Sequence, residues 1–178
     1  MDTGSRRLPA LILAGLAVAT AVRCAQVWPQ LPPVVASHFD AHGVPNGFQP
    51  RAVLVGIALG AQLLGIFVFA LAPALLHRIP PRWLNLPHKQ AWLASGRLGE
   101  AVERYATWSL WFGCATAALL LGIFELAFQA NLTRQPMNAT LAWTLLAGYL
   151  VLTFAAIVRL YRALRPPPAH GAVGDPAR

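Results

Sequence analysis

The sequence predicts an all-α membrane protein, a bundle of four transmembrane helices with both termini cytoplasmic, an ordered outward loop and a cytoplasmic interfacial helix. Three observations predict this fold. Of the 178 residues, 57% are hydrophobic and only 11% are charged, whereas an ordinary soluble domain carries about 25% charged residues. Long apolar runs reach the roughly 20 residues that cross a hydrocarbon core. Arg and Lys gather at the ends of these runs, as the distribution of positive charge in membrane proteins predicts.

The predicted spans are residues 8–28, 52–76, 108–130 and 139–160, within a single domain of residues 1–165. Residues 166–178 are rich in Pro and Gly, so we expect a disordered tail. The first span also resembles a secretory signal, because Arg6 and Arg7 precede it. Its apolar run continues to Trp28, which is long for a signal core and favours a retained span.

The uneven placement of basic residues predicts the threading. Basic residues precede the first span, fill the connection between the second and third, and follow the fourth. We therefore expect both termini and residues 78–107 in the cytoplasm, and the segments 31–51 and 131–138 outside. We therefore interpret the formal net charge of +8 as the basic residues that set the orientation of the spans in the membrane. No basic-aromatic motif accompanies it, so we expect no nucleic-acid partner.

The outward segment Leu31–Arg51 is punctuated by Pro and Gly, which predicts a compact loop. His38, Asp40 and His42 alternate, and in an extended strand such residues share a face that could bind a divalent metal. The favoured interpretation is that His38 and Asp40 hydrogen-bond to the backbone and lock the loop, with Phe39 on the membrane surface. We accordingly expect no metal site.

The cytoplasmic connection predicts a helix lying on the inner membrane surface, because Leu98, Val102 and Tyr105 recur at helical spacing. Trp83 and Trp92 are expected to enter the interface. A binding site for a cytoplasmic partner is the alternative. Two further expectations concern the spans: Gly56 and Gly60 pack against the face of Cys114, Ala118 and Gly122, and the two cysteines, Cys24 and Cys114, are free thiols.

Several polar side chains lie inside predicted spans: Arg23, Gln62, Glu125 and Gln129. Arg23 and Glu125 fall at about the same depth, roughly 8–9 Å from the outer end of their spans. Such charges are costly in lipid unless they are paired or solvated. The sequence leaves open whether they pair. If they do, they and the outward loop would frame an outward-facing polar pocket.

The run from Trp28-Pro29 through His38-Phe39, Gly43 and Pro45-Asn46 to Arg51 resembles a bacterial membrane family of unknown function, the one numbered sixteen forty-eight. The same run is similar to the amino-terminal part of the SdpI-type immunity proteins, which protect producing cells from a secreted peptide toxin. The segment Asn85–Arg97 is similar to a cytoplasmic motif of that family. Ala36 and Arg51 depart from the family pattern, which usually has proline and lysine there. The resemblance implies a multi-pass protein of the bacterial plasma (inner) membrane.

The candidate binding residues are His38, Phe39, Asp40, Gly43, Pro45, Asn46, Arg51, Arg23 and Glu125, and the cytoplasmic motif comprises Asn85, Pro87, Lys89, Trp92 and Arg97. The chain contains no catalytic triad motif, H-E-x-x-H sequence or phosphate-binding glycine loop, so we expect neither an enzyme nor a cofactor.

Two functions follow from these observations. One is a non-catalytic membrane protein that acts in peptide-toxin immunity or envelope signalling by contacting a peptide or a membrane-protein partner. The alternative is a carrier or channel-like module for a small solute or ion. The lipid bilayer is a partner in both, and the oligomeric state stays open.

Overall fold

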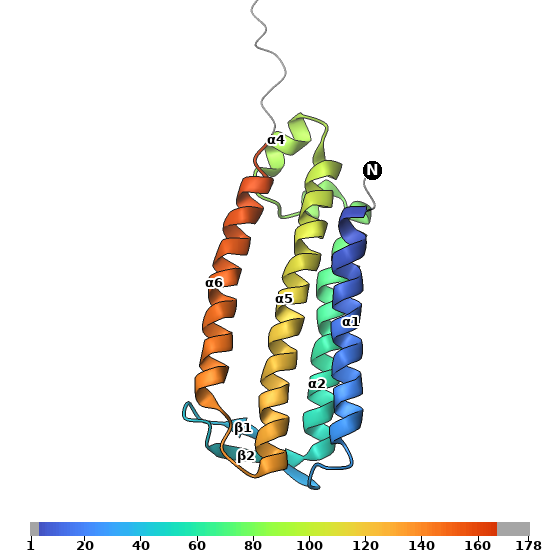
Figure 1. Cartoon of the computed structure of the whole chain (residues 1–178). Coiled ribbons are helices and arrows are strands. Elements are labelled where there is room, and N and C mark those ends of the chain that lie inside the picture. The colour runs from blue at the N-terminus through green and yellow to red at the C-terminus, as the bar shows by residue number, and fades with distance from the viewer. Residues whose placement is uncertain (1–3, 167–178) are drawn as a thin grey trace, which may run out of the picture.

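The computed structural model describes residues 4–166, which form four long helical segments side by side with a β-hairpin at one end (Figure 1). Three of these segments are α1 (Gly4–Val27), α5 (Leu98–Thr133) and α6 (Ala139–Ala163). The second begins as α2 (Arg51–Ile66) and continues through a π-helical turn (Phe67–Leu71) into α3 (Ala72–Leu75). Short 3₁₀ turns at Leu76–Arg78 and Pro81–Trp83 and the helix α4 (Lys89–Ala94) lie in the connection to α5.

Four helices are long and apolar enough to cross a membrane, which confirms the predicted number of spans. The start of α1 and the end of α6 lie at the same end of the bundle, here called the terminal end. The hairpin lies at the opposite end, here called the hairpin end (Figure 1). This arrangement places residues 78–97 at the terminal end and the segment 28–50 at the hairpin end.

The compact loop predicted for residues 31–51 is a β-hairpin, and the fold is therefore not purely helical. Strands β1 (Val34–Phe39) and β2 (Pro45–Pro50) pair antiparallel, with Val34 opposite Pro50 and Phe39 opposite Pro45. The two prolines of β2 stand at its ends, where the loss of a backbone donor disturbs the ladder least. Irregular register near His38 shows that β1 is bulged there.

The helix α5 is continuous over 36 residues, which corrects the prediction of a separate interfacial helix. At 1.5 Å per residue it is about 54 Å long, whereas the hydrocarbon core is about 30 Å thick. Leu98, Val102 and Tyr105 therefore form the first turns of a helix that is longer than a hydrocarbon core is thick. The helix predicted at these residues is confirmed, whereas its separation from the span at Trp108 and its course along the membrane surface are wrong.

Helices α1, α2 and α5 share the main apolar core. Near the hairpin end, Val27, Leu54, Ala58 and Phe128 are buried together with Val35 of β1. The predicted packing of Gly56 and Gly60 is wrong, because nothing lies within 4 Å of a Cβ built on either glycine. The close approach to α5 occurs instead at Gly113, where such a Cβ would lie 2.5 Å from Cβ of Phe69.

Pro73 explains the irregular course of the second span. Proline has no backbone N–H and cannot donate to the carbonyl four residues earlier, which here is that of Phe69. The Ser109 hydroxyl of α5 donates to this Phe69 carbonyl at 3.2 Å. A side chain of the neighbouring helix thus satisfies the acceptor that the proline leaves free.

Helix α6 packs mainly along α5, and its hydrogen bonds to the rest of the chain lie largely near its two ends. At the hairpin end, the Trp143 indole donates to the Ala41 carbonyl at 3.0 Å. At the terminal end, the indole of Trp108 donates to Ala156 and that of Trp92 to Leu164. Between these ends most apolar side chains of α6 are exposed to the surroundings of the protein, which in a membrane are lipid.

Candidate binding site at the hairpin end

The tip of the hairpin is closed by Asp40. Its Oδ1 accepts hydrogen bonds from the backbone N–H groups of His42 and Val44, both at 2.9 Å. The Val44 bond, with a smaller contribution from the His42 bond, holds the pKa of the Asp40 carboxyl below its ordinary value, against the opposing effect of desolvation. A carboxylate that accepts from nearby backbone donors in this way defines a tight turn.

Gly43 joins the hairpin tip to the start of α6. Its φ of +83° lies in the left-handed region, and a Cβ at this position would come within 2.0 Å of the Met137 carbonyl oxygen. The Met137 N–H donates to the Gly43 carbonyl at 2.9 Å. Only glycine satisfies both the backbone conformation and this close approach.

Asn131 attaches β1 to α5. Its Oδ1 accepts from the Ala36 N–H at 2.7 Å, and its Nδ2 donates to the carbonyls of Ala36 and Ala127, both at 2.9 Å. Asn131 was not among the predicted binding residues, because in the sequence it marked only the start of the turn 131–138. A lone Asn at the end of an apolar run was the available signal. Both backbone groups of Ala36 are satisfied by one side chain.

Arg51 closes the base of the hairpin. Its guanidinium donates to the carbonyls of Trp28 and Leu31 at 3.0 and 2.9 Å and lies 4.6 Å above the Trp28 ring. Arg51, a predicted binding residue, thus makes its contacts within the protein. Asp40 and Gly43 also make their contacts within the protein, as described above.

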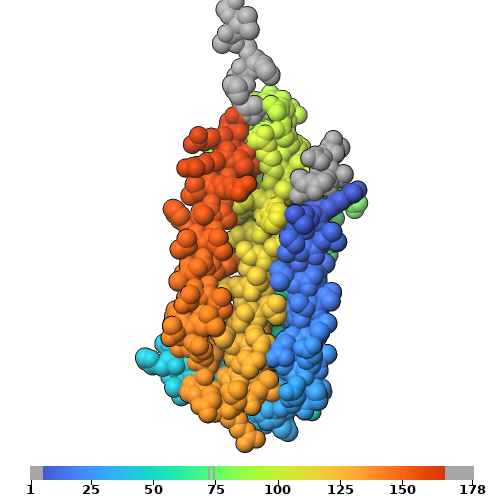
Figure 2. All heavy atoms as spheres, viewed as in Figure 1, coloured from blue at the N-terminus to red at the C-terminus, as the bar shows by residue number. Residues whose placement is uncertain are grey.

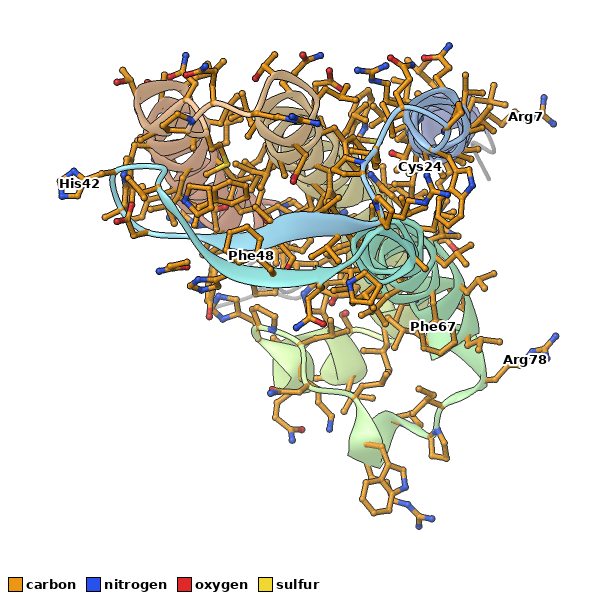
Figure 3. All side chains as sticks on the ribbon, turned by 90° about the horizontal axis from the view of Figure 1, so that it is seen from below. Arg7, Cys24, His42, Phe48, Phe67 and Arg78 are labelled. Atoms are coloured by element: carbon orange, nitrogen blue, oxygen red, sulfur yellow. The ribbon has the colours of Figure 1, made fainter. Side chains whose placement is uncertain are left out.

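The hairpin residues that remain accessible are of mixed character. Phe48 is 60% exposed, and Val34 and Val44 are also exposed. The exposed His38 ring is in contact with the Asn46 side chain across the hairpin through Nδ1 and Oδ1, while Phe39 and Pro45 are partly buried. Viewed onto the hairpin end, His42 points away from the helices at the tip (Figure 3). The surface offers rings, an amide and aliphatic groups on a backbone that is held in place.

The alternative of a His-Asp-His metal site depends on an extended segment, and the chain turns there instead. Asp40 faces its own backbone and the His38 ring faces Asn46. Within residues 4–166, no group of three His, Cys, Asp or Glu side chains is placed to hold a metal ion.

Arg23 and Glu125 form a bidentate ion pair between α1 and α5. Arg23 Nε donates to Oε2 of Glu125 at 2.6 Å, and Arg23 Nη2 donates to Oε1 of Glu125 at 2.9 Å. The Gln129 amide also donates to Glu125 at 2.7 Å. Two parallel bonds of this kind are the strongest form of carboxylate recognition by arginine. The question that the sequence left open is therefore answered by a direct pair.

The ion pair lines a shallow groove of about 600 Å³ between α1 and α5, together with Gln26, Ala118 and Gly122. No described hairpin residue lines this groove. The ion pair and the accessible hairpin residues are hence separate features. Deeper between the spans, the buried Gln62 amide donates to the Thr20 hydroxyl and to the Ala117 carbonyl at 3.0 and 3.1 Å.

The residues of the predicted cytoplasmic motif lie at the terminal end, where several of them make contacts within the fold. Trp92 is fully buried beneath Leu84 and Leu164, which corrects its prediction as an interfacial residue. Arg97 binds Glu100, and Lys89 donates to the Arg82 carbonyl at 3.2 Å. The other members of the motif differ in accessibility: Asn85 is exposed and Pro87 is partly buried. Cys24 and Cys114 are buried free thiols, as predicted. The predicted disordered tail from residue 167 onward lies outside the described residues.

Residues 15–61 match the family described as a domain of unknown function, DUF1648. The match covers the second half of α1, both strands and most of α2. It includes Arg23 and the hairpin, whereas Glu125 and Asn131 lie outside it. No curated protein and no solved structure matches the chain significantly.

Proposed function

From a domain of unknown function in a chain with four candidate membrane spans, we propose a non-catalytic integral membrane protein whose hairpin end contacts a peptide or a membrane-protein partner. The observation that carries this proposal is the β-hairpin, which is attached to helices at its base, strand and tip while its outer side chains stay accessible. We place it in a bacterial inner membrane with the termini cytoplasmic and the hairpin outside, as the charge distribution predicts.

Preorganisation is the physical reason to assign binding to the hairpin. A surface that is already ordered loses little conformational entropy when a partner binds. Arg51, Asn131 and Gly43 order it from three sides, and none of the three contacts is a flexible exposed ion pair. Phe48 then supplies an exposed aromatic ring, a type of side chain that is enriched in the cores of protein interfaces, and Val44 adds exposed apolar area beside it.

A secreted membrane-active peptide is the partner class that we favour. Such a peptide approaches from outside and is amphipathic, which matches the mixed apolar and polar character of the exposed residues. The resemblance to the SdpI-type immunity proteins favours the same class. The alternative of a carrier has less support, because Gln62 binds Thr20 and Arg23 binds Glu125 in place of lining a continuous polar path.

The test is deletion of the gene followed by challenge with a panel of secreted membrane-active peptides. We expect the deletion strain to become sensitive to at least one peptide and the wild-type chain to restore tolerance. A chain with Phe48→Ser or His38→Ala should restore less, at equal abundance in the membrane by immunoblot. Gln49→Ala is the matched control, because Gln49 is an exposed neighbour in β2 with no described side-chain hydrogen bond.

Unchanged tolerance to every peptide after deletion would overturn the immunity proposal. Full restoration by the Phe48 and His38 variants would remove the hairpin from it. Uptake of a solute into liposomes that contain the purified chain, together with a stable oligomer on a sizing column, would support the carrier in its place.

A further inference from the structure

The terminal end contains a second and larger groove, of about 1630 Å³, between α5, α6 and the start of α1. Figure 2 shows the face on which α5 lies between α1 and α6. The groove exceeds the roughly 300–1,000 Å³ of typical small-molecule pockets. None of the hairpin residues contributes to it.

One part of the groove is apolar. Trp111 and Phe112 of α5 face Leu152 and Ala155 of α6 across it. Trp111 is 46% and Leu152 is 59% exposed. These residues lie within the candidate spans, so the wall runs along the hydrocarbon region of a bilayer.

The other part is basic. Four arginines, Arg6, Arg7, Arg104 and Arg159, line it with two glutamates, Glu100 and Glu103, which leaves a formal charge of +2 with His77 neutral. Arg6 pairs with Glu103, and Arg104 pairs with Glu100. Arg159 has no ion-pair partner within residues 4–166, and Nε of Arg6 is buried without a hydrogen-bond partner there. Arg7 also lines the groove, but its side chain points away from α5 and α6 (Figure 3).

We propose that this groove binds one anionic phospholipid of the leaflet at the terminal end. Its headgroup lies against Arg159, whose guanidinium has no ion-pair partner within residues 4–166. One acyl chain lies along the wall of Trp111, Leu152 and Ala155. The basic rim begins where the span Arg6–Val27 begins, which is the depth of lipid headgroups. Basic pockets between helices at this depth recognise anionic headgroups, and an amphiphile matches both parts of the groove.

The probe is phosphatidylglycerol, compared with phosphatidylcholine of identical acyl chains. The full chain, purified in detergent, is titrated with each lipid, and bound lipid is counted by native mass spectrometry. We expect one tightly retained phosphatidylglycerol per chain. The affinity for phosphatidylcholine should be lower by about tenfold or more. The variant Arg159→Gln should lose roughly fivefold or more in affinity for phosphatidylglycerol.

The matched control is Arg162→Gln, which removes the same charge from the same helix at an exposed residue outside the groove. It should bind phosphatidylglycerol like the wild type. Equal losses in the two variants would mean that lipid binds the basic surface in general, and the proposal would then fail. Equal binding of the two lipids by the wild type would also overturn it.

A separate arm tests the apolar wall. Ala155→Trp fills the groove with every arginine intact, and Ala155 is exposed, so the larger side chain does not disturb a packed core. We expect it to displace phosphatidylglycerol, whereas glycerol phosphate without acyl chains should compete weakly with the lipid in the wild type. Tight binding of lipid to this variant, or complete competition by glycerol phosphate, would contradict an acyl chain in the groove.

Discussion

Gly43 is the residue at which the hairpin tip and the start of α6 approach most closely. Gly43→Ala should lower the free energy of unfolding by about 2–4 kcal/mol, because it combines an unfavourable positive φ with overlap on the Met137 carbonyl. Unfolding in detergent by heat or denaturant measures the difference. The matched control is Gly56→Ala, where nothing lies within 4 Å of the new Cβ, and we expect a change of less than about 1 kcal/mol. Equal effects at the two glycines would contradict the close approach.

Asp40 makes the hairpin tip sensitive to acid. Its pKa in the folded protein is lowered, chiefly by the Val44 N–H. The carboxylate therefore contributes stability above the unfolded pKa of about 3.9, and this contribution is lost as the pH falls through the lower folded value. We expect the amide resonances of His42 and Val44 to titrate between pH 5 and 2 with a midpoint below about 3.9.

The Asp40→Asn variant provides the control for this titration, because an amide keeps an acceptor oxygen and has no proton to gain. Its His42 and Val44 amides should stay constant over the same range. A midpoint at or above the ordinary value of an aspartate in the wild-type protein would mean that the turn does not stabilise the charged carboxylate.

At the scale of elements, the ion pair between α1 and α5 joins two spans within the apolar part of the bundle. Arg23→Leu and Glu125→Leu should each lower the free energy of unfolding, because each leaves a charge without its partner. The double variant should lose less than the sum of the two, with a coupling of about 0.5–3 kcal/mol. The measurement is a double-mutant cycle of unfolding in detergent or nanodiscs.

A control cycle uses Arg134 in place of the Arg23 position. Arg134 is exposed and has no ion-pair partner within residues 4–166. Arg134→Leu and Glu125→Leu should be additive within about 0.3–0.5 kcal/mol. Additive losses for Arg23 and Glu125 as well would show that the pair contributes nothing to stability.

At the scale of the whole molecule, the start of α1 and the end of α6 lie at one end of the described residues and the hairpin at the other, as an even number of spans requires. The charge distribution predicts that the hairpin end faces outward. In a chain with both native cysteines replaced, an impermeant thiol reagent added to intact cells should label Gln49→Cys and spare Gln90→Cys. Both positions are exposed, so accessibility to the reagent depends on the side of the membrane. Labelling of Gln90→Cys alone would show that the orientation in the membrane is opposite to the predicted one.

The four spans could be predicted from the sequence because hydropathy and length are sums over neighbouring residues, and the bilayer imposes both requirements locally. The free cysteines followed from the same threading. The prolines and glycines of residues 31–51 marked the end of one helix and the start of another. They did not reveal the strand pairing, because a ladder depends on which backbone groups face each other across the hairpin.

Only the tertiary structure decided which polar groups meet. Asn131 and Ala36 are separated by 95 residues, and Ser109 reaches the Phe69 carbonyl that Pro73 leaves free only because α5 packs at that height. The sequence placed Arg23 and Glu125 at about the same depth in their spans. An ion pair also requires that the two helices turn these side chains toward each other. The large groove depends on how far α6 stands from α1 across α5. Such features are properties of helix rotation and spacing, which packing at many positions sets together, and no single segment of the sequence encodes them.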